Sequence, residues 1–205
     1  MSFSKRLLDL GLSILLGLVL LPVLLVLLAV LAISEGRPLF YVSERMRSPD
    51  RAFGLIKLRT MPIGADKVGG VTGGDKQREM SRMHRLLRRS RADEIPQLWN
   101  VIRGDMSLVG PRPPLRRYVE DYPQIYGPVL ESRPGITGLA SLVFHGHEER
   151  LLAACSTPEE TDAVYRRRCI PAKAQLDMIY ARKRTLCWDL ALIARTAAKP
   201  FLRGK

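Results

Sequence analysis

A long apolar stretch near the N-terminus is the strongest feature of the hydrophobic pattern. Residues 10–34 carry no charge, and 20 of these 25 positions are apolar. As one helix, at about 1.5 Å per residue, the stretch would be about 37 Å long, enough to cross a hydrocarbon core of roughly 30 Å. Pro22 near its middle lacks a backbone donor, so we expect a kink or break there. The pattern predicts a membrane anchor over residues 1–36.

Basic residues flank both ends of this anchor. Lys5 and Arg6 precede it, and four arginines follow it closely: Arg37, Arg45, Arg47 and Arg51. Because basic residues favour the cytoplasmic side, both ends prefer the same side, which favours a re-entrant helix that bends at Pro22 and returns. The length of the stretch favours a kinked span instead. The sequence leaves these two topologies open, and a buried core helix is a third interpretation.

The next part of the chain shows a strand pattern and then a loop. Apolar and polar positions alternate over residues 53–58, which predicts a strand that pairs with residues 39–42 in a small hairpin. Residues 64–75 contain five glycines, but they lack the order of glycines that phosphate-binding loops use. We therefore expect a connecting loop there and no nucleotide fingerprint.

Residues 76–91 predict an amphipathic basic helix. They include seven basic side chains and one acidic side chain. At helical spacing, Met83 and Leu87 share one face, and Arg82, Arg85 and Arg89 share another. These arginines either face solvent or contact phosphate groups and anionic lipid. His84, on the same helix, is expected to be exposed.

The C-terminal quarter predicts further helices. Thr157-Pro158-Glu159-Glu160 is a helix start with a capping residue and a proline at the first position. Pro171 is expected to interrupt that helix, and a second piece runs to Arg184. Residues 185–202 form an apolar helical pattern that either lies flat on a membrane or packs in the core, with Asp189 and Arg195 on its polar side.

Composition narrows the class of protein. The 205 residues include 33 Lys and Arg against 20 Asp and Glu, a net charge of +13, which disfavours an acidic or neutral cytosolic enzyme. The spacing of the three cysteines, Cys155, Cys169 and Cys187, matches no zinc site, and we interpret them as reduced thiols. The sequence predicts an α+β fold, mostly helical with a small β-hairpin, in which residues 37–205 form one domain with amphipathic interfacial helices.

Several motifs, taken together in chain order, resemble one enzyme family. They are Lys5-Arg6 with Asp9, Lys57-Leu58-Arg59-Thr60-Met61, the run from Ser90 to Val101, GDMSLVGPRP at residues 104–113, and Pro134-Gly135-Ile136-Thr137-Gly138. The combination resembles the bacterial sugar transferases, which are monotopic phosphoglycosyl transferases. The resemblance implies that residues 37–205 transfer a phospho-sugar from a UDP-sugar to a polyprenol (undecaprenyl) phosphate and start a glycan on that lipid.

The resemblance makes Asp93 and Glu94 the catalytic pair. Asp93 would attack the sugar-bearing phosphate, UMP would leave, and the lipid phosphate would attack the covalent intermediate in a ping-pong mechanism. The two adjacent carboxylates also make a Mg²⁺ site plausible. Taken alone, Asp93 before Glu-Ile-Pro is an ordinary helix start, and a capping role does not exclude a catalytic one.

Other family positions carry over as substrate-binding residues. Arg112 lies between Pro111 and Pro113. Because the two prolines restrict the backbone, they would hold the guanidinium of Arg112 in place for bidentate contact with a phosphate. Arg88 is a candidate second phosphate ligand, although it also fits a surface arginine cluster. Lys57 and Arg59 carry over as support of the active site.

The chain departs from the family pattern near the expected donor pocket. After Pro-Gly-Ile-Thr-Gly, Ser141 replaces a glutamine and His145 stands at an arginine position, which puts the contacts to the donor sugar in doubt. Leu21 replaces the serine before Pro22. His145-Gly146-His147 is interpreted as a polar loop beside the donor pocket, since no third metal ligand is evident.

The resemblance places the protein on the cytoplasmic face of the bacterial inner (plasma) membrane, in contact with membrane lipids. A homodimer is compatible with it, and no nucleic-acid partner is expected. The competing hypothesis is a non-catalytic basic protein that binds a membrane surface or another anionic ligand. Such a binder would tolerate Asp93→Asn, and its binding would weaken steeply with salt.

Overall fold

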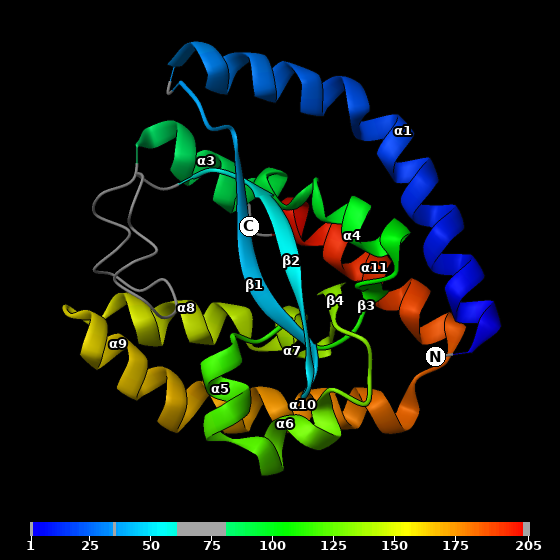
Figure 1. Cartoon of the computed structure of the whole chain (residues 1–205), viewed down its shortest axis with the longest axis vertical. Coiled ribbons are helices and arrows are strands. Elements are labelled where there is room, and N and C mark those ends of the chain that lie inside the picture. Colours follow the sequence, from blue (N-terminus) through cyan, green and yellow to red (C-terminus); the bar gives the residue numbers. More distant parts are fainter. Residues whose placement is uncertain (1, 35, 61–80, 203–205) are drawn as a thin grey trace.

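The computed structural model describes residues 2–34, 36–60 and 81–202 of the chain. It confirms an α+β fold that is mostly helical with a small antiparallel hairpin (Figure 1). The elements are α1 (Phe3–Ser34), β1 (Phe40–Ser48), β2 (Arg51–Leu58), α3 (Arg82–Ser90), η1 (Ala92–Glu94), α4 (Gln97–Arg103), β3 (Ser107–Val109), α5 (Arg116–Asp121), α6 (Pro123–Val129), β4 (Gly135–Thr137), α7 (Leu139–Val143), α8 (His145–Ala153), α9 (Pro158–Val164), η2 (Tyr165–Cys169), α10 (Ile170–Lys183) and α11 (Leu186–Leu202). The predicted glycine loop over 64–75 and the first part of the basic helix, 76–80, lie outside the described residues.

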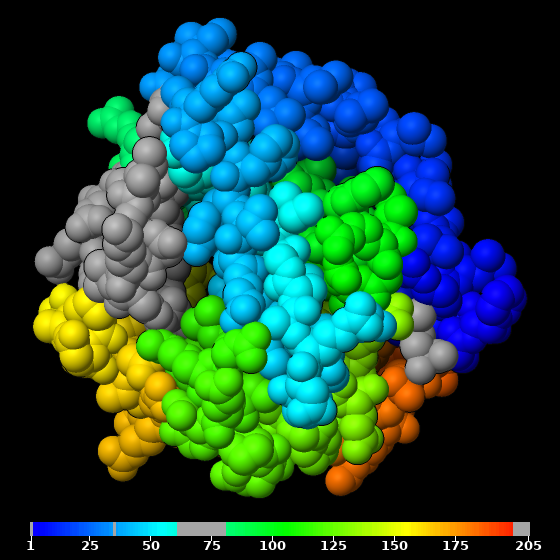
Figure 2. Space-filling model, in the orientation of Figure 1, coloured from blue at the N-terminus to red at the C-terminus, as the bar shows by residue number. Residues whose placement is uncertain are grey.

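Helix α1 is long and apolar enough to cross a membrane, and it contains Pro22. It bends around one side of the molecule (Figure 1), and the space-filling view shows it as a rim along that edge (Figure 2). Its buried side chains include Lys5, Asp9 and Ser13, whereas many large apolar side chains point outward, among them Leu15, Leu18, Val19, Leu25 and Val26. The first part of α1 thus differs from a helix of a soluble protein, because its polar side chains face inward while large apolar side chains are uncovered.

Both arms of α1 pack on the rest of the chain. Before Pro22, Leu12, Leu16 and Leu20 contact the cluster around Val101 and Met106. After it, a second group of leucines contacts the cluster of Leu31, Leu58 and Leu87; this group is Leu24, Leu27 and Leu28. The bend therefore lets one helix follow the curved surface of the domain on both sides of the proline.

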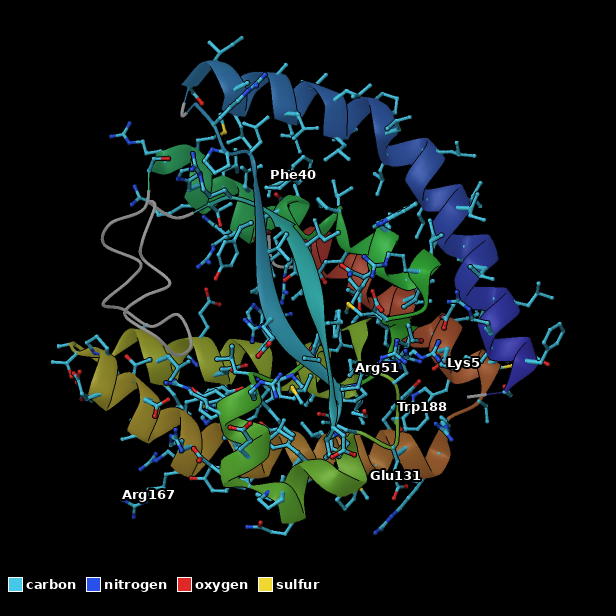
Figure 3. The ribbon with its side chains drawn as sticks, viewed as in Figure 1. Lys5, Phe40, Arg51, Glu131, Arg167 and Trp188 are labelled. Atoms are coloured by element: carbon cyan, nitrogen blue, oxygen red, sulfur yellow. The ribbon has the colours of Figure 1, made fainter. Side chains whose placement is uncertain are left out.

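The first turn of α1 is tied to α11 by a buried ion pair. Lys5 Nζ lies 2.6 Å from Asp189 Oδ2, and the Tyr180 hydroxyl donates to Asp189 Oδ1. Figure 3 shows Lys5 and Trp188 close to this end of α1. Arg6 adds two hydrogen bonds to the backbone carbonyls of Val101 and Ile102 at the end of α4, where helix carbonyls commonly need partners from outside the helix.

The sequence predicts that Asp189 and Arg195 share a polar side of α11, and this prediction is wrong. Asp189 is buried and Arg195 is exposed, so the two do not share a solvated face. The reason is the ion pair with Lys5, which a pattern within one helix cannot reveal. Leu192 of α11 is buried in the core, as one of the two predicted alternatives requires, while Leu186 and Leu190 remain exposed.

The predicted hairpin forms from β1 and β2, and it is longer than expected. The strands pair antiparallel with Phe40 opposite Leu58 and Val42 opposite Ile56. Asn100 of α4 fastens the hairpin to the helix behind it: its Oδ1 accepts from the backbone of Ile56, and its Nδ2 donates to the carbonyl of Gly54. Because Asn100 is fully buried, these bonds fix the distance between β2 and α4.

The short parallel strands β3 and β4 were not predicted. They bring together two of the motifs, since Ser107 pairs with Gly135 and Val109 with Thr137. The backbones approach so closely that a Cβ at Gly110 would lie 2.1 Å from the carbonyl oxygen of Arg133. Strands of three residues are too short for an alternation of apolar and polar positions to be recognised. Glycine is required at position 110 because the backbone of the paired segment lies so close.

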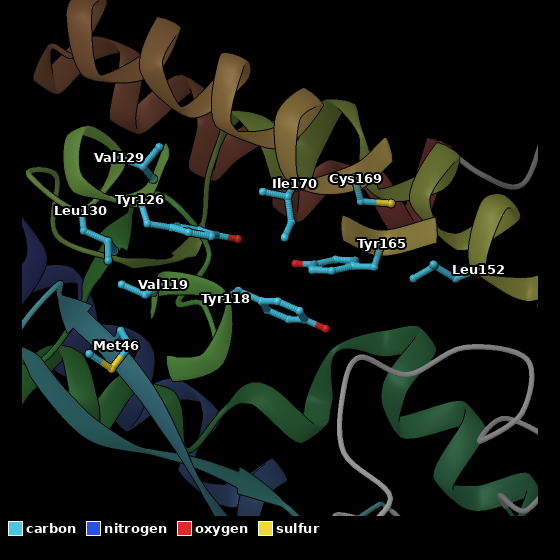
Figure 4. Close-up of a cluster of buried hydrophobic side chains, with 10 residues drawn as sticks. All are labelled: Met46, Tyr118, Val119, Tyr126, Val129, Leu130, Leu152, Tyr165, Cys169 and Ile170. Atoms are coloured by element: carbon cyan, nitrogen blue, oxygen red, sulfur yellow. The ribbon is translucent and has the colours of Figure 1, made fainter. Parts of the chain in front are cut away.

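The C-terminal helices form the other half of the molecule. Helix α9 begins after Thr157, whose side chain accepts from the backbone of Glu160, as the sequence predicts. The predicted interruption near Pro171 is a π-helical turn, η2, between α9 and α10. With α5 and α6, these helices enclose a core that contains Tyr118, Tyr126 and Tyr165 (Figure 4).

Two histidine predictions are wrong. His84 is buried and not exposed, because it lies one turn before Leu87 on the face of α3 that turns inward. The segment from His145 to His147 is helical and not a loop, because α7 is followed directly by α8. There His147 packs edge-on against Phe144, with ring centroids 5.2 Å apart.

Candidate active site

A cavity of about 410 Å³ brings most of the predicted site residues together. Seven of them line it: Lys57, Arg88, Asp93, Glu94, Arg112, Pro113 and His145. They come from β2, α3, η1, α8 and the segment after β3, so the site is assembled from distant parts of the chain. The volume is in the range of pockets that hold small-molecule ligands.

The short turn η1 holds Asp93 and Glu94. It follows Arg91, which ends α3 in the left-handed conformation with φ of 61°. A non-glycine residue in that conformation costs about 1–3 kcal/mol, and such strain is typical of functional sites. The expectation that Asp93 caps a helix is not met, because α4 begins later, after Pro96, and no side chain caps it.

Glu94 is held by two arginines. Its Oε1 accepts from Arg112 at 2.8 Å and from Arg91 at 3.0 Å. Burial alone would raise the pKa of Glu94, but Arg112, Arg91 and Lys57 outweigh it, and the pKa is well below the usual range. Glu94 is therefore a fixed negative charge that holds Arg112 beside the turn.

Arg112 is positioned by the strand pair. The backbone of Gly135 donates to the carbonyl of Pro111, and the backbone of Gly110 donates to the carbonyl of Thr137. These bonds fix the chain on one side of Arg112, and Pro113 restricts it on the other. The two glycine-containing motifs thus act together to place one guanidinium in the cavity.

Asp93 differs from its neighbour. It is 5% exposed, and its Oδ1 has no hydrogen-bond partner among the described residues. Burial and the charge of Glu94 raise its pKa, and Lys57, Arg88 and Arg112 oppose that rise. A buried carboxylate oxygen without a partner, surrounded by three cations, is poised to meet an electrophile or a metal ion.

Lys57 and Arg88 complete the ring of cations. Burial and the charge of Arg112 lower the pKa of Lys57 to about 7. Arg88 donates through Nε to the hydroxyl of Thr60, 3.0 Å away. Thr60 belongs to the same motif as Lys57, so this motif supplies one cation and orients another. The set of cations at the cavity fits a diphosphate better than a neutral ligand.

Arg59 is placed elsewhere. It does not line the cavity, and its guanidinium donates to the carbonyl of Gly36 just after α1. The backbone of Arg59 still donates to the carbonyl of Leu39, so the hairpin pairing continues past Leu58 and brings Arg59 beside the segment that follows α1. The structure therefore gives Arg59 a contact at the end of the anchor.

The two departures from the family pattern near the expected donor pocket both reach the cavity. These residues are Ser141 and His145. Burial and the charge of Arg91 lower the pKa of His145 to about 4. His145 is therefore neutral near pH 7 and offers hydrogen bonding without charge.

Sequence reasoning missed several lining residues. Arg45 and Arg91 add to the cations, and side chains of η2 and α10 also line the cavity, including Tyr165, Lys173 and Asp177. Arg91 stands inside a recognised motif, and its position next to Asp93 was a usable signal. The others lie on elements whose packing against the site is a property of the fold.

The donor set fits Mg²⁺ held largely by a substrate. Among the described residues, no group of three or more His, Cys, Asp or Glu side chains could hold a metal ion. Mg²⁺, however, commonly binds through one or two carboxylates, water and substrate phosphates. Asp93, with its unpartnered oxygen, and the adjacent Glu94 provide such carboxylates.

Comparison with known proteins places this site in a family. The model described as bacterial sugar transferase matches residues 1–203. The uncharacterized sugar transferase EpsL of Bacillus subtilis is 37% identical over 67% of this chain and 67% of its own length. The UDP-glucose:undecaprenyl-phosphate glucose-1-phosphate transferase of Caulobacter vibrioides is 37% identical over 67% of this chain and 53% of its own length.

A longer relative shares the same region. The UDP-N-acetylgalactosamine-undecaprenyl-phosphate N-acetylgalactosaminephosphotransferase of Aeromonas hydrophila is 30% identical over 71% of this chain and 35% of its own length. The matched region thus spans between about a third and two thirds of these three relatives. Since the family model covers nearly the whole sequence, the chain belongs to the bacterial sugar transferase family.

Proposed function

We propose that this chain transfers a phospho-sugar from a UDP-sugar to a polyprenol phosphate and releases UMP. The observation that carries the proposal is the environment of Asp93, a buried carboxylate with an unpartnered oxygen in a cavity lined by Lys57, Arg88 and Arg112. Relatives are named for transfer of a sugar phosphate to undecaprenyl phosphate, which supports the same class of donor and acceptor here.

In the first step, a carboxylate oxygen of Asp93 attacks the phosphorus that bears the sugar. The new oxygen–phosphorus bond forms as the bond from that phosphorus to the UMP oxygen breaks, and UMP leaves with the electron pair. Burial disfavours the anionic form of Asp93, so bonding to phosphorus removes a poorly solvated charge. Arg112 and Arg88 bind the charge on the phosphates.

In the second step, a phosphate oxygen of the polyprenol phosphate attacks the same phosphorus. The bond to Asp93 breaks, the carboxylate is restored, and the product is a polyprenol diphosphate sugar. One residue thus divides a difficult displacement into two easier ones. Glu94 keeps its charge throughout because two arginines hold it, and so it keeps Arg112 in place.

Asp93 and Glu94 would also hold Mg²⁺. When bound, the ion would offset the repulsion between the carboxylates and the incoming diphosphate. The other positive charges of the cavity are side chains of the protein, and these contact the donor in addition to the metal ion.

Transfer assays with Asp93→Asn test the proposal. The change is nearly isosteric and removes the nucleophile, so we expect UMP release from any active UDP-sugar to fall by about a thousandfold or more. Membrane attachment and melting temperature should match those of the unaltered enzyme. Normal turnover by the purified variant would contradict the assignment of Asp93.

We further propose that α1 enters the cytoplasmic leaflet of the inner membrane and returns to the same side. Support comes from the packing of both arms of α1 on the domain and from the outward apolar side chains. A cysteine at Ser2 should then react with an impermeant thiol reagent only from the cytoplasmic side. Labelling from the periplasmic side would favour a span.

A further inference from the structure

One group of residues that line the cavity has no part in the mechanism above. We define the inner chamber by the six residues Tyr126, Tyr165, Ile170, Lys173, Ala174 and Asp177, all of which line the cavity. They come from α6, η2 and α10, and Figure 1 shows α6 and α10 near the bottom of the view and α3 near its top. The chamber therefore differs in chemistry from the cation-rich part around the catalytic pair.

Asp177 is the unusual side chain of the inner chamber. It is 7% exposed, and its Oδ1 has no hydrogen-bond partner among the described residues. Lys173, one turn earlier on α10, does not neutralise it by direct contact: its ammonium group donates to Glu148 at 2.8 Å and lies 3.4 Å from the Tyr165 hydroxyl. Burial raises the pKa of Asp177 to about 7. A buried polar atom without a partner is costly, so its retention in a cavity wall calls for a ligand.

Two tyrosines line the same cavity as this carboxyl group. Figure 4 shows the hydroxyls of Tyr126 and Tyr165 pointing toward one another, with Ile170 beside them. Tyr165 begins the π-helical turn that leads into α10. Turns of this kind are often found at functional sites, because the extra residue changes which side chains a helix presents. The turn here contains Tyr165 and leads directly into the helix that carries Lys173 and Asp177.

The combination of groups suits a neutral ring with several hydroxyls. A carboxyl group accepts hydrogen bonds from hydroxyls, tyrosine and lysine donate to ring or substituent oxygens, and aromatic faces pack on the apolar side of a ring. A phosphate or a carboxylate would be repelled by Asp177 and Glu148. The diphosphate of the donor finds its cations at Arg88 and Arg112, which leaves the less basic inner chamber for an uncharged part of the same molecule.

We propose that the inner chamber binds the sugar ring of the donor and that Asp177 selects among sugars by accepting hydrogen bonds from their hydroxyls. This inference rests on the proposed function, since it names the part of the donor that occupies one region of the same cavity. It makes Asp177 a residue that determines specificity and leaves the reacting atoms to Asp93.

The test compares Asp177→Asn and Asp177→Ala with Gln175→Ala. Gln175 is exposed on the same helix and does not line the cavity, so it controls for changes to α10. For each protein we would measure kcat/KM with UDP-glucose, UDP-galactose, UDP-N-acetylglucosamine and UDP-N-acetylgalactosamine, the affinity for UMP by calorimetry, and the melting temperature.

We expect both Asp177 variants to lose at least about tenfold in kcat/KM with the preferred donor and to change the ratio between donors. Binding of UMP should stay within about twofold of the unaltered enzyme, because UMP lacks the sugar. The Gln175→Ala variant should match the unaltered enzyme in every measurement.

Three other outcomes would overturn the inference. An equal loss with all four donors would mean that Asp177 acts only on the fold or the chemistry. A matching loss of UMP affinity would place the uridine in the inner chamber. Unchanged kinetics in both variants would leave Asp177 without a role in donor binding. If the unaltered enzyme releases UMP from none of the donors, the proposed function itself fails, whereas turnover with any donor keeps the two questions separate.

Discussion

Lys57 shows how burial sets the charge of a single residue at the site. Its pKa is lowered to about 7, first by burial and then by Arg112. The ammonium form is therefore present below pH 7 and is lost as the pH rises above it. Since the charged form is the one that attracts the donor phosphates, the pH dependence of donor capture should report on this residue.

We predict that kcat/KM for the donor falls above about pH 7, by up to about tenfold per pH unit. Lys57→Arg should keep its charge and remove this fall up to pH 9, and Lys57→Gln should be weak and insensitive to pH over the same range. Initial rates at low donor concentration from pH 6 to 9 would measure this. An unchanged fall in Lys57→Gln would show that another group titrates.

At the residue scale, the motifs of the sequence located Asp93, Glu94 and most of the cations that line the cavity. Prediction from the sequence failed where the role of a residue depends on a contact with a residue distant in the sequence. His84 looks like an exposed residue of a basic helix and is buried. Arg59 shares a motif with Lys57, yet it contacts Gly36 and not the cavity. Asp177 has no motif, and only the fold places it beside the site.

At the scale of the elements, the contact between α1 and α11 fastens the start of the N-terminal helix to the rest of the protein. Lys5 and Asp189 form a buried pair, and Tyr180 adds a hydrogen bond to the carboxylate. Removing one partner leaves the other charge buried and alone, which typically costs about 3–5 kcal/mol.

We predict that Lys5→Met and Asp189→Asn each lower the free energy of unfolding in detergent by several kcal/mol. The double variant should lose less than the sum, because it leaves no unpaired charge. Denaturant unfolding of the three variants would give the coupling energy. Additive effects would mean that the pair contributes nothing of its own.

The elements themselves were predictable in proportion to their length. The apolar run predicted α1, the alternation of apolar and polar residues predicted the hairpin, and the capping sequence at Thr157 predicted the start of α9. Strands β3 and β4 were missed because each has three residues and is held by glycines in close backbone contact. Periodicity cannot detect a pairing of that size.

At the scale of the whole molecule, two features favour association with a membrane. One is the net charge of +13, and the other is the apolar side of α1 that the fold leaves uncovered. A purely basic binder depends on the first and a monotopic enzyme mainly on the second. Salt separates them, because charges are screened within about 3 Å at 1 M ionic strength.

We predict that washing membranes with about 1 M salt leaves the protein in the pellet and that detergent releases it. Immunoblots of pellet and supernatant would measure the distribution. Release by salt alone would support the competing hypothesis of an electrostatic surface binder.

The central claim is that Asp93 becomes bonded to phosphorus during turnover, and mass spectrometry of the enzyme tests it most directly. The enzyme would be mixed with Mg²⁺ and a UDP-sugar that it turns over, without lipid acceptor, and then digested. We predict a phospho-sugar adduct on the peptide that carries Asp93, absent in Asp93→Asn and lost when polyprenol phosphate is added. UMP release with no adduct on that peptide, or an adduct on another residue, would contradict the account.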